Sequence, residues 1–161
     1  MMEKSIKRLV FSLFTLFFAY AISNSIMSVV QTNVIREYNL ISVRQGFMDL
    51  ASRIGMLIAF FSIPFLQSKV KRIIILCAGT GSMIVNMCII GFGPSFMVFL
   101  CSLTLIGIGS CYLDSFLNAL IIDLSGEQSI KYVNMLHMSF AIGAMVNPFI
   151  INKIRDIFVR V

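Results

Sequence analysis

The chain has 161 residues, of which 58% are hydrophobic and only 12% are charged. A soluble domain carries roughly 25% charged residues, so this composition excludes an ordinary soluble globular protein and indicates an integral membrane protein. The net charge of +6 does not indicate nucleic-acid binding, because the basic residues form short clusters between apolar runs. We therefore expect the lipid bilayer as a partner and no nucleic acid.

Apolar runs follow one another along the chain, each about as long as the roughly 20 residues that a helix needs to cross a bilayer. The five runs cover residues 9–31, 45–66, 73–92, 95–122 and 132–151. The sequence therefore predicts an all-α membrane domain over residues 1–161, with five transmembrane helices. Pro64 and Pro148 are expected near helix ends, where a missing N–H costs least. A cleaved secretory signal is the less favoured interpretation of the first run, since hydrophobicity resumes at Ile22.

The basic clusters predict the orientation of these helices, because turns rich in Lys and Arg stay in the cytoplasm. This rule predicts a cytoplasmic N-terminus for a multi-pass protein of the inner or plasma membrane. The basic residues on the cytoplasmic side would be Lys4, Lys7, Arg8, Lys69, Lys71, Arg72 and Lys131. The tail with Lys153, Arg155 and Arg160 would then lie on the wrong side. This mismatch and the odd number of helices predict a chain truncated before a sixth helix.

Asp114 lies near the middle of the fourth run, and Asn118 follows it one helical turn later on the same face. A carboxylate at this depth costs about 2.5–3.5 kcal/mol, and it usually faces a bundle interior or an aqueous cavity. We expect Asp114 to be a reversible proton carrier on a solute path. The alternative is a hydrogen-bonded peg between helices. Asn24, Asn134 and His137 are the other residues expected on the path, although a packing role fits His137 equally well.

Two further groups of charged residues are candidates for gating. Asp49 and Arg53 are four residues apart in the second run, and this i, i+4 pair is either a structural salt bridge or part of a gate. Asp123 ends the fourth run, where it is either a plain interfacial charge or one side of a cytoplasmic latch. The other side of the latch would consist of Lys69, Lys71 and Arg72.

Nothing in the sequence indicates catalysis. It has no Ser/His/Asp arrangement and no metal-ligand spacing, and Gly107 and Gly109 lack the strand–turn–helix context of a nucleotide fingerprint. The four cysteines lie inside apolar runs, where a small apolar packing role is favoured. We therefore expect no cofactor, no metal and no enzymatic activity.

Several short motifs occur in a familiar order between Leu105 and Pro148. They are Gly107-x-Gly109, Leu113-Asp114 with Asn118, Asn134-x-x-His137, Phe140 and Gly143-Ala144. These motifs resemble the fourth and fifth spans of major facilitator superfamily transporters, most of all the branch of fucose/sugar–proton symporters. Residues 37–40 and 52–56 are similar to the loop and the second span of such carriers.

The resemblance implies the N-terminal part of a carrier, with helices in inverted repeats that face a C-terminal half across a central cavity. The chain departs from the family pattern at two places. Gln67 stands where the family has an Asp after the second span, and Asn24 and Ser25 stand where this branch has an acidic residue in the first span. Proton coupling would then depend on Asp114 alone.

The favoured hypothesis is a secondary active transporter, or a fragment of one, for a small polar solute such as a sugar. Its partners would be the solute, protons and either a missing C-terminal half or a second copy of the chain, because one bundle cannot rock alone. The alternative from another class is a small non-transporting membrane scaffold, in which Asp114 is a peg between subunits. Within the superfamily, an exporter of amphipathic compounds also fits the many Phe and Met residues.

Overall fold

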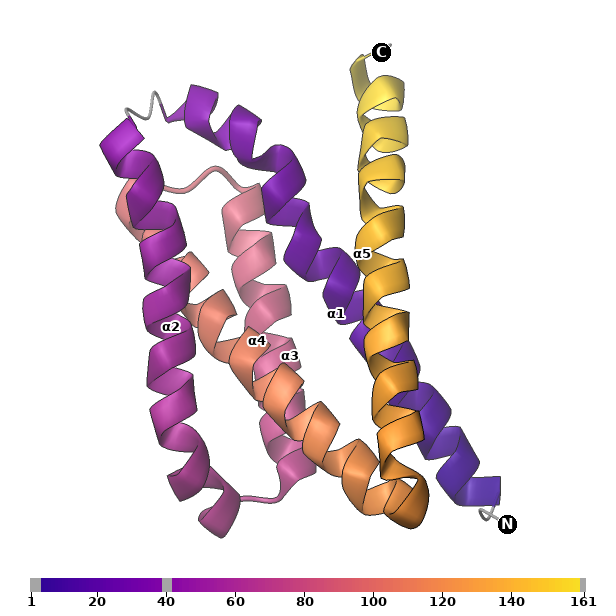
Figure 1. Ribbon diagram of the computed structural model, residues 1–161. Helices are drawn as coiled ribbons and strands as arrows, with labels where there is room; N and C mark the ends of the chain where they lie inside the picture. Colours follow the sequence, from indigo (N-terminus) through magenta and orange to yellow (C-terminus); the bar gives the residue numbers. More distant parts are fainter. Residues whose placement is uncertain (1–3, 39–41, 160–161) are drawn as a thin grey trace. The chain divides into compact units, whose positions relative to one another are not determined.

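The structure, a computed structural model, describes residues 4–38 and 42–159, and within them the side-chain surroundings of residues 6–26, 38, 46–151 and 153. The elements in chain order are α1 (Lys4–Glu37), α2 (Ser42–Lys69), α3 (Arg72–Gly91), α4 (Phe96–Ser125), the 3-10 turn η1 (Gly126–Gln128) and α5 (Ser129–Val159) (Figure 1). The described part of the chain contains no strand. The predicted all-α class is confirmed.

Long apolar helices dominate this architecture. Four stretches are long and apolar enough to cross a membrane, and they are Ile6–Ile26, Gly46–Lys69, Arg72–Gly91 and Phe96–Ile151. The described part of the chain is therefore built from helices of the membrane-spanning kind, as the composition predicts. The last stretch has 56 residues and includes α4, η1 and α5. At 1.5 Å per residue it would measure about 84 Å, far more than the hydrocarbon core of a bilayer.

The helices continue beyond the apolar runs. α1 extends to Glu37 and α5 to Val159, and only η1 separates α4 from α5. The reason is that hydropathy marks where a segment meets lipid, whereas a helix ends only where its backbone groups find other partners. One expected placement was wrong for this reason, because Pro148 lies inside α5 rather than near its end. In the basic tail, Lys153 is exposed, and Arg160 lies outside the described residues.

The helices form two compact units. Unit 1 combines Met1–Val34 with Asn118–Val161, and unit 2 consists of Ile35–Leu117. Unit 1 thus contains most of α1, the end of α4, η1 and α5. Unit 2 contains α2, α3 and most of α4. Each boundary lies within a helix.

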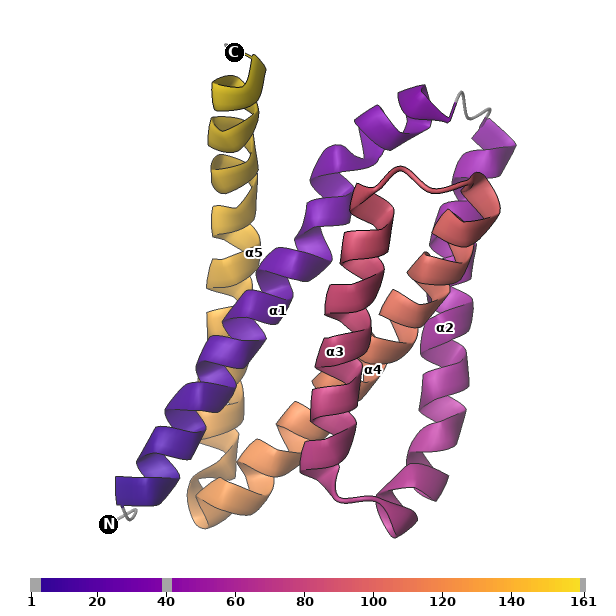
Figure 2. The same ribbon diagram turned by 180° about the vertical axis from the view of Figure 1, so that it is seen from behind.

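In unit 2, glycines allow α4 to approach α2 and α3 closely (Figure 2). A Cβ atom added at Gly55 on α2 would collide with the backbone carbonyl of Thr104 on α4, and one added at Gly107 would collide with the carbonyl of Ser52. These contacts bring backbone against backbone. Small residues have this role at helix contacts in membranes, where tight packing replaces the hydrophobic effect.

In unit 1, α5 packs against the first half of α1. A Cβ atom at Gly143 would lie 2.7 Å from the carbonyl oxygen of Phe18 and 3.0 Å from the Cβ of Ala21. The rings of Phe17 and Phe140 join the same contact, with centroids 5.1 Å apart. The start of α1 and the turn η1 lie at the same end of this unit (Figures 1 and 2).

Candidate functional site

Asp114 is exposed on a face of α4 whose other residues near it are buried or half-buried. Ser110, four residues earlier, is 5% exposed, and Leu117, three residues later, is 0% exposed. Residues at these spacings share one face of a helix. The exposed carboxylate therefore lies between the buried Ser110 and Leu117 on one side and the half-buried Cys111 and Asn118 on the other.

Tyr112 joins α4 to both of the other helices of unit 2. The Ser62 hydroxyl donates to the carbonyl of Ala59 at 2.7 Å, so the Tyr112 hydroxyl is the donor in its 2.6 Å hydrogen bond to Ser62 Oγ. The Cβ of Tyr112 also lies 3.5 Å from where a Cβ of Gly79 on α3 would be. On an α-helix, a residue and the second residue after it lie about 200° apart around the helix axis. Tyr112 thus contacts α2 and α3 from the side of α4 opposite to Asp114, whereas Gly107 and Ser110, on the side of Asp114, contact Ser52 of α2 and Met83 of α3.

Asp114 has polar neighbours on its own helix. Cys111, three residues before it, is half-buried and forms a hydrogen bond with the side chain of Ser115. The sequence interpretation treated Cys111 as a packing residue and counted Ser115 among the polar residues in the middle of the fourth span, without a separate role. Their position next to a mid-helix acid is visible in the sequence, but short polar side chains are common in membrane helices and give a weak signal.

Asn24 on α1 repeats in unit 1 the exposure pattern of Asp114. The side chain is exposed, whereas Tyr20 and Ala21, one turn earlier, are buried, and so is Phe17 one further turn back. A buried helix face thus continues into an exposed amide. This position fits the predicted role of Asn24 on a polar path.

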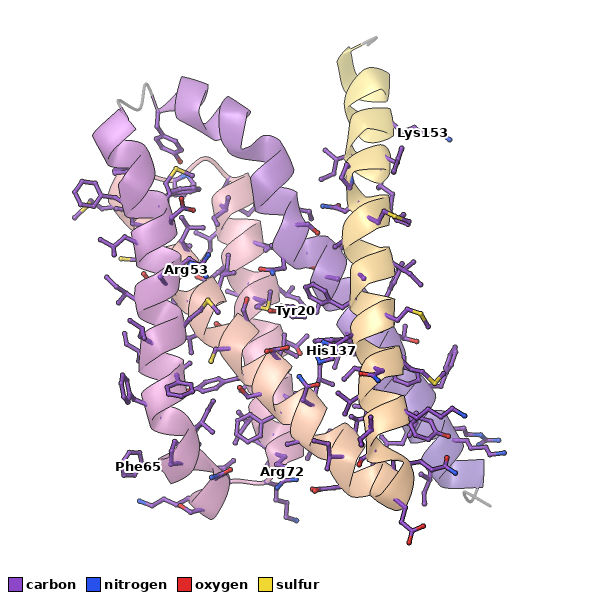
Figure 3. The ribbon with its side chains drawn as sticks, viewed as in Figure 1. Tyr20, Arg53, Phe65, Arg72, His137 and Lys153 are labelled. Atoms are coloured by element: carbon purple, nitrogen blue, oxygen red, sulfur yellow. The ribbon has the colours of Figure 1, made fainter. Side chains whose placement is uncertain are left out.

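An aromatic cluster lies next to this position in unit 1. The Phe17 ring contacts Tyr20 with a centroid separation of 5.6 Å, and the Tyr20 and Phe140 rings are 5.5 Å apart. The exposed imidazole of His137 meets Phe17 edge to face at 5.8 Å and 70°. Figure 3 labels His137 on α5 and Tyr20 on α1 in this part of unit 1. His137 therefore packs with one side of its ring and is accessible on the rest. Aromatic faces with a few polar groups are typical of sites that bind small molecules.

The other residues predicted for the path are divided between the units. Asn134 is exposed on α5, and Asn118 is half-buried near the end of α4; both belong to unit 1, with Asn24 and His137. Asp114 belongs to unit 2. A common path through all five side chains stays a prediction.

The gating residues are divided in a similar way. Asp49 and Arg53 are both exposed on α2, and their ion pair stays a prediction. Asp123 is exposed and belongs to unit 1, whereas its expected partners belong to unit 2. Of these partners, Lys69 and Lys71 are exposed and Arg72 is half-buried. The latch also stays a prediction.

Sequence reasoning missed Asn147. This side chain is fully buried within α5, and its amide nitrogen and oxygen have no hydrogen-bond partner among the described residues. The available signal was the pair Asn147-Pro148 inside an apolar run, because an amide and a proline together are costly there.

No protein-family model matches the chain, and no curated protein or solved structure is significantly similar to it. The likeness to major facilitator carriers therefore depends on the motifs in the sequence alone. Among the residues that the structure describes, no group of three or more His, Cys, Asp or Glu could hold a metal ion.

Proposed function

We propose that the chain is a membrane domain of a secondary transporter for a small polar solute such as a sugar, with Asp114 as its proton-coupling group. The observation that carries this proposal is the exposed Asp114 between buried neighbours on α4. Lipid cannot solvate a carboxylate, so this position needs water or a polar partner. An aqueous path provides both a solvent for the charged form and a route for the proton.

The cluster in unit 1 supports a sugar as the solute. The half-buried ring of Phe140, which packs against the buried Phe17 and Tyr20, offers an apolar face for the C–H groups of a pyranose. The amide of Asn24 and the imidazole of His137, both exposed, can donate to and accept from its hydroxyl groups. A purely lipid-facing surface needs neither of these polar side chains.

The proposal includes five spans with a cytoplasmic N-terminus. Gly126 has a φ of 53°, and α4 ends directly before it. This turn supports a division of the 56-residue stretch into two spans. The start of α1, which carries Lys7 and Arg8, lies at the same end of unit 1 as η1, which Lys131 follows in the sequence (Figure 1). This common basic end fits the positive-inside rule. Alternating access requires a second bundle, either a C-terminal half or another copy of the chain.

The test is proton-driven uptake of labelled neutral monosaccharides into vesicles that contain the full chain. We expect accumulation to need an inward proton gradient and to fall at least about tenfold in Asp114→Asn, with membrane insertion unchanged, because the amide cannot carry a proton. Glu127→Gln, an exposed acid in η1, is the matched control and should accumulate solute normally. Undiminished accumulation by Asp114→Asn contradicts the coupling role.

The scaffold hypothesis also agrees with an exposed Asp114 in the isolated chain, but it predicts that a partner protein, and not water, contacts this carboxylate in the membrane. A scaffold would place the carboxylate against a partner protein, where water-soluble reagents cannot reach it. An exporter of amphipathic compounds would instead prefer cationic, drug-like solutes over sugars. The accessibility of position 114 and the solute preference therefore separate the three functions.

A further inference from the structure

Asn147 is a buried amide that the protein does not satisfy. Its side chain is 0% exposed, and both Nδ2 and Oδ1 are without hydrogen-bond partners in the part of the chain that the structure describes. Asn86 on α3 shows the usual arrangement, because it is also buried but its Nδ2 donates to the carbonyl of Ser82 at 2.8 Å. Buried amides are costly unless they are paired, so Asn147 requires an explanation.

Pro148 adds a second polar group beside this amide. Proline has no N–H, so the carbonyl of Ala144, four residues earlier, loses the donor that a regular helix supplies. Ala144 precedes Asn147 by three residues, and the two therefore lie on the same side of α5. Together they offer the two donors of Nδ2, the acceptor Oδ1 and the freed carbonyl. Membrane helices tolerate such freed groups only where another polar group satisfies them.

This side of α5 is directed toward α1. Gly143, one turn before Asn147, is the residue whose added Cβ would meet Phe18 and Ala21. Residues four apart share a helix face, so Asn147 continues the face that contacts α1. A ligand at Asn147 would therefore lie between two helices of unit 1.

We propose that Asn147, with the freed carbonyl of Ala144, binds a hydroxyl group of the transported solute, an inference that rests on the proposed function. A hydroxyl accepts from Nδ2 and donates to Oδ1 or to the carbonyl, so one group satisfies both kinds of atom. A cation would satisfy the acceptors but face the amide donors, and an anion would do the opposite. The chemistry therefore favours a neutral polyhydroxy compound. Its entry requires α1 and α5 to separate beside Gly143, which couples binding to a movement of these helices.

The experiment measures thermal unfolding of the full chain in detergent, with and without a panel of neutral monosaccharides and polyols. In Asn147→Leu, we expect a higher Tm than in the wild type without ligand, because the unpartnered amide is gone. The same variant should lose the sugar-induced rise in Tm, with at least tenfold weaker binding. The matched control is Asn86→Leu, which should have a lower Tm, because it loses a satisfied hydrogen bond, but keep the sugar response. If Asn147→Leu does not fold, the smaller Asn147→Val replaces it.

The outcomes separate this inference from the proposed function. A full sugar response in Asn147→Leu overturns the inference and leaves the transporter proposal intact. A response to sodium chloride but not to sugars, lost in Asn147→Leu, identifies a cation site and also overturns it. If no compound of the panel stabilises the wild type, the inference and the choice of a sugar-like solute both fail. Uptake that depends on Asp114 but not on Asn147 contradicts only the inference.

Discussion

The Tyr112 hydroxyl donates a 2.6 Å hydrogen bond to Ser62 Oγ and so joins the middle of α4 to the last third of α2. This bond, with the close contact between Gly79 and Gly109, sets the rotation of α4 about its axis. The rotation decides which residues of α4 are buried in unit 2. It also sets the position of the exposed Asp114, so packing contacts determine where the charged group is presented.

Tyr112→Phe should destabilise the protein by about 0.6–1.5 kcal/mol, the range for one net hydrogen bond in water or in a membrane. The measurement is the free energy of unfolding in a denaturing-detergent titration. Ser62→Ala should cost a similar amount, and the double variant should cost less than the sum. Ser68→Ala is the control, because its exposed hydroxyl bonds only to the carbonyl of Phe65 in its own helix. Strictly additive losses at Tyr112 and Ser62 would show that the bond does not couple the helices.

Gly55→Ala and Gly107→Ala should each destabilise the protein by about 1–3 kcal/mol. Each new methyl group would clash with a main-chain carbonyl, which cannot rotate away as a flexible side chain can. The same titration measures this loss. Gly81→Ala on α3 is the matched control, since nothing lies within 4 Å of the added atom. We expect it to be neutral or to stabilise by up to about 1 kcal/mol through helix propensity. Equal effects at Gly81 and Gly107 would refute the close contact of α4 with α2.

Asp114→Cys should react with membrane-impermeant thiol reagents when the chain lies in a bilayer. The physical reason is that thiolate chemistry needs water, and a transport path would supply it at this depth. Phe61→Cys on α2 is the control, because Phe61 is 69% exposed on an apolar surface that we expect to face lipid. Both changes are made in a background without the four native cysteines. Position 61 should therefore stay unlabelled, and absence of labelling at position 114 as well would favour the scaffold over the transporter.

His137→Phe separates the two roles that the sequence left open. The new ring keeps the edge contact with Phe17, so we expect the free energy of unfolding to change by less than about 0.5 kcal/mol. The polar nitrogens are lost, and sugar uptake should fall several-fold. His137→Ala is the companion variant, which should lose stability as well as uptake. If His137→Phe transports like the wild type, His137 is a packing residue.

The helices themselves could be predicted from the sequence, because the composition of each apolar run determines whether it prefers lipid. Their ends were less predictable, since α1 and α5 continue through polar residues that no hydropathy pattern marks. The sequence indicates that small residues such as Gly55 and Gly107 allow helices to pack closely. It does not say which helix lies against each of them, because small residues permit many helix pairings.

Two polar residues show most clearly which properties cannot be predicted from the sequence. Asp114 stands out in the sequence because a carboxylate in an apolar run is costly in any arrangement. Its exposed position between the buried Ser110 and Leu117 depends on the packing of α4, and only the tertiary structure decides it. Asn147 shows the reverse case, because an amide in a helix is unremarkable until burial removes its partners. The sequence by itself determined which segments prefer lipid and which residues carry charge. The packing of helices decided which polar groups are satisfied, since hydrogen bonding and burial depend on neighbours that are distant along the chain.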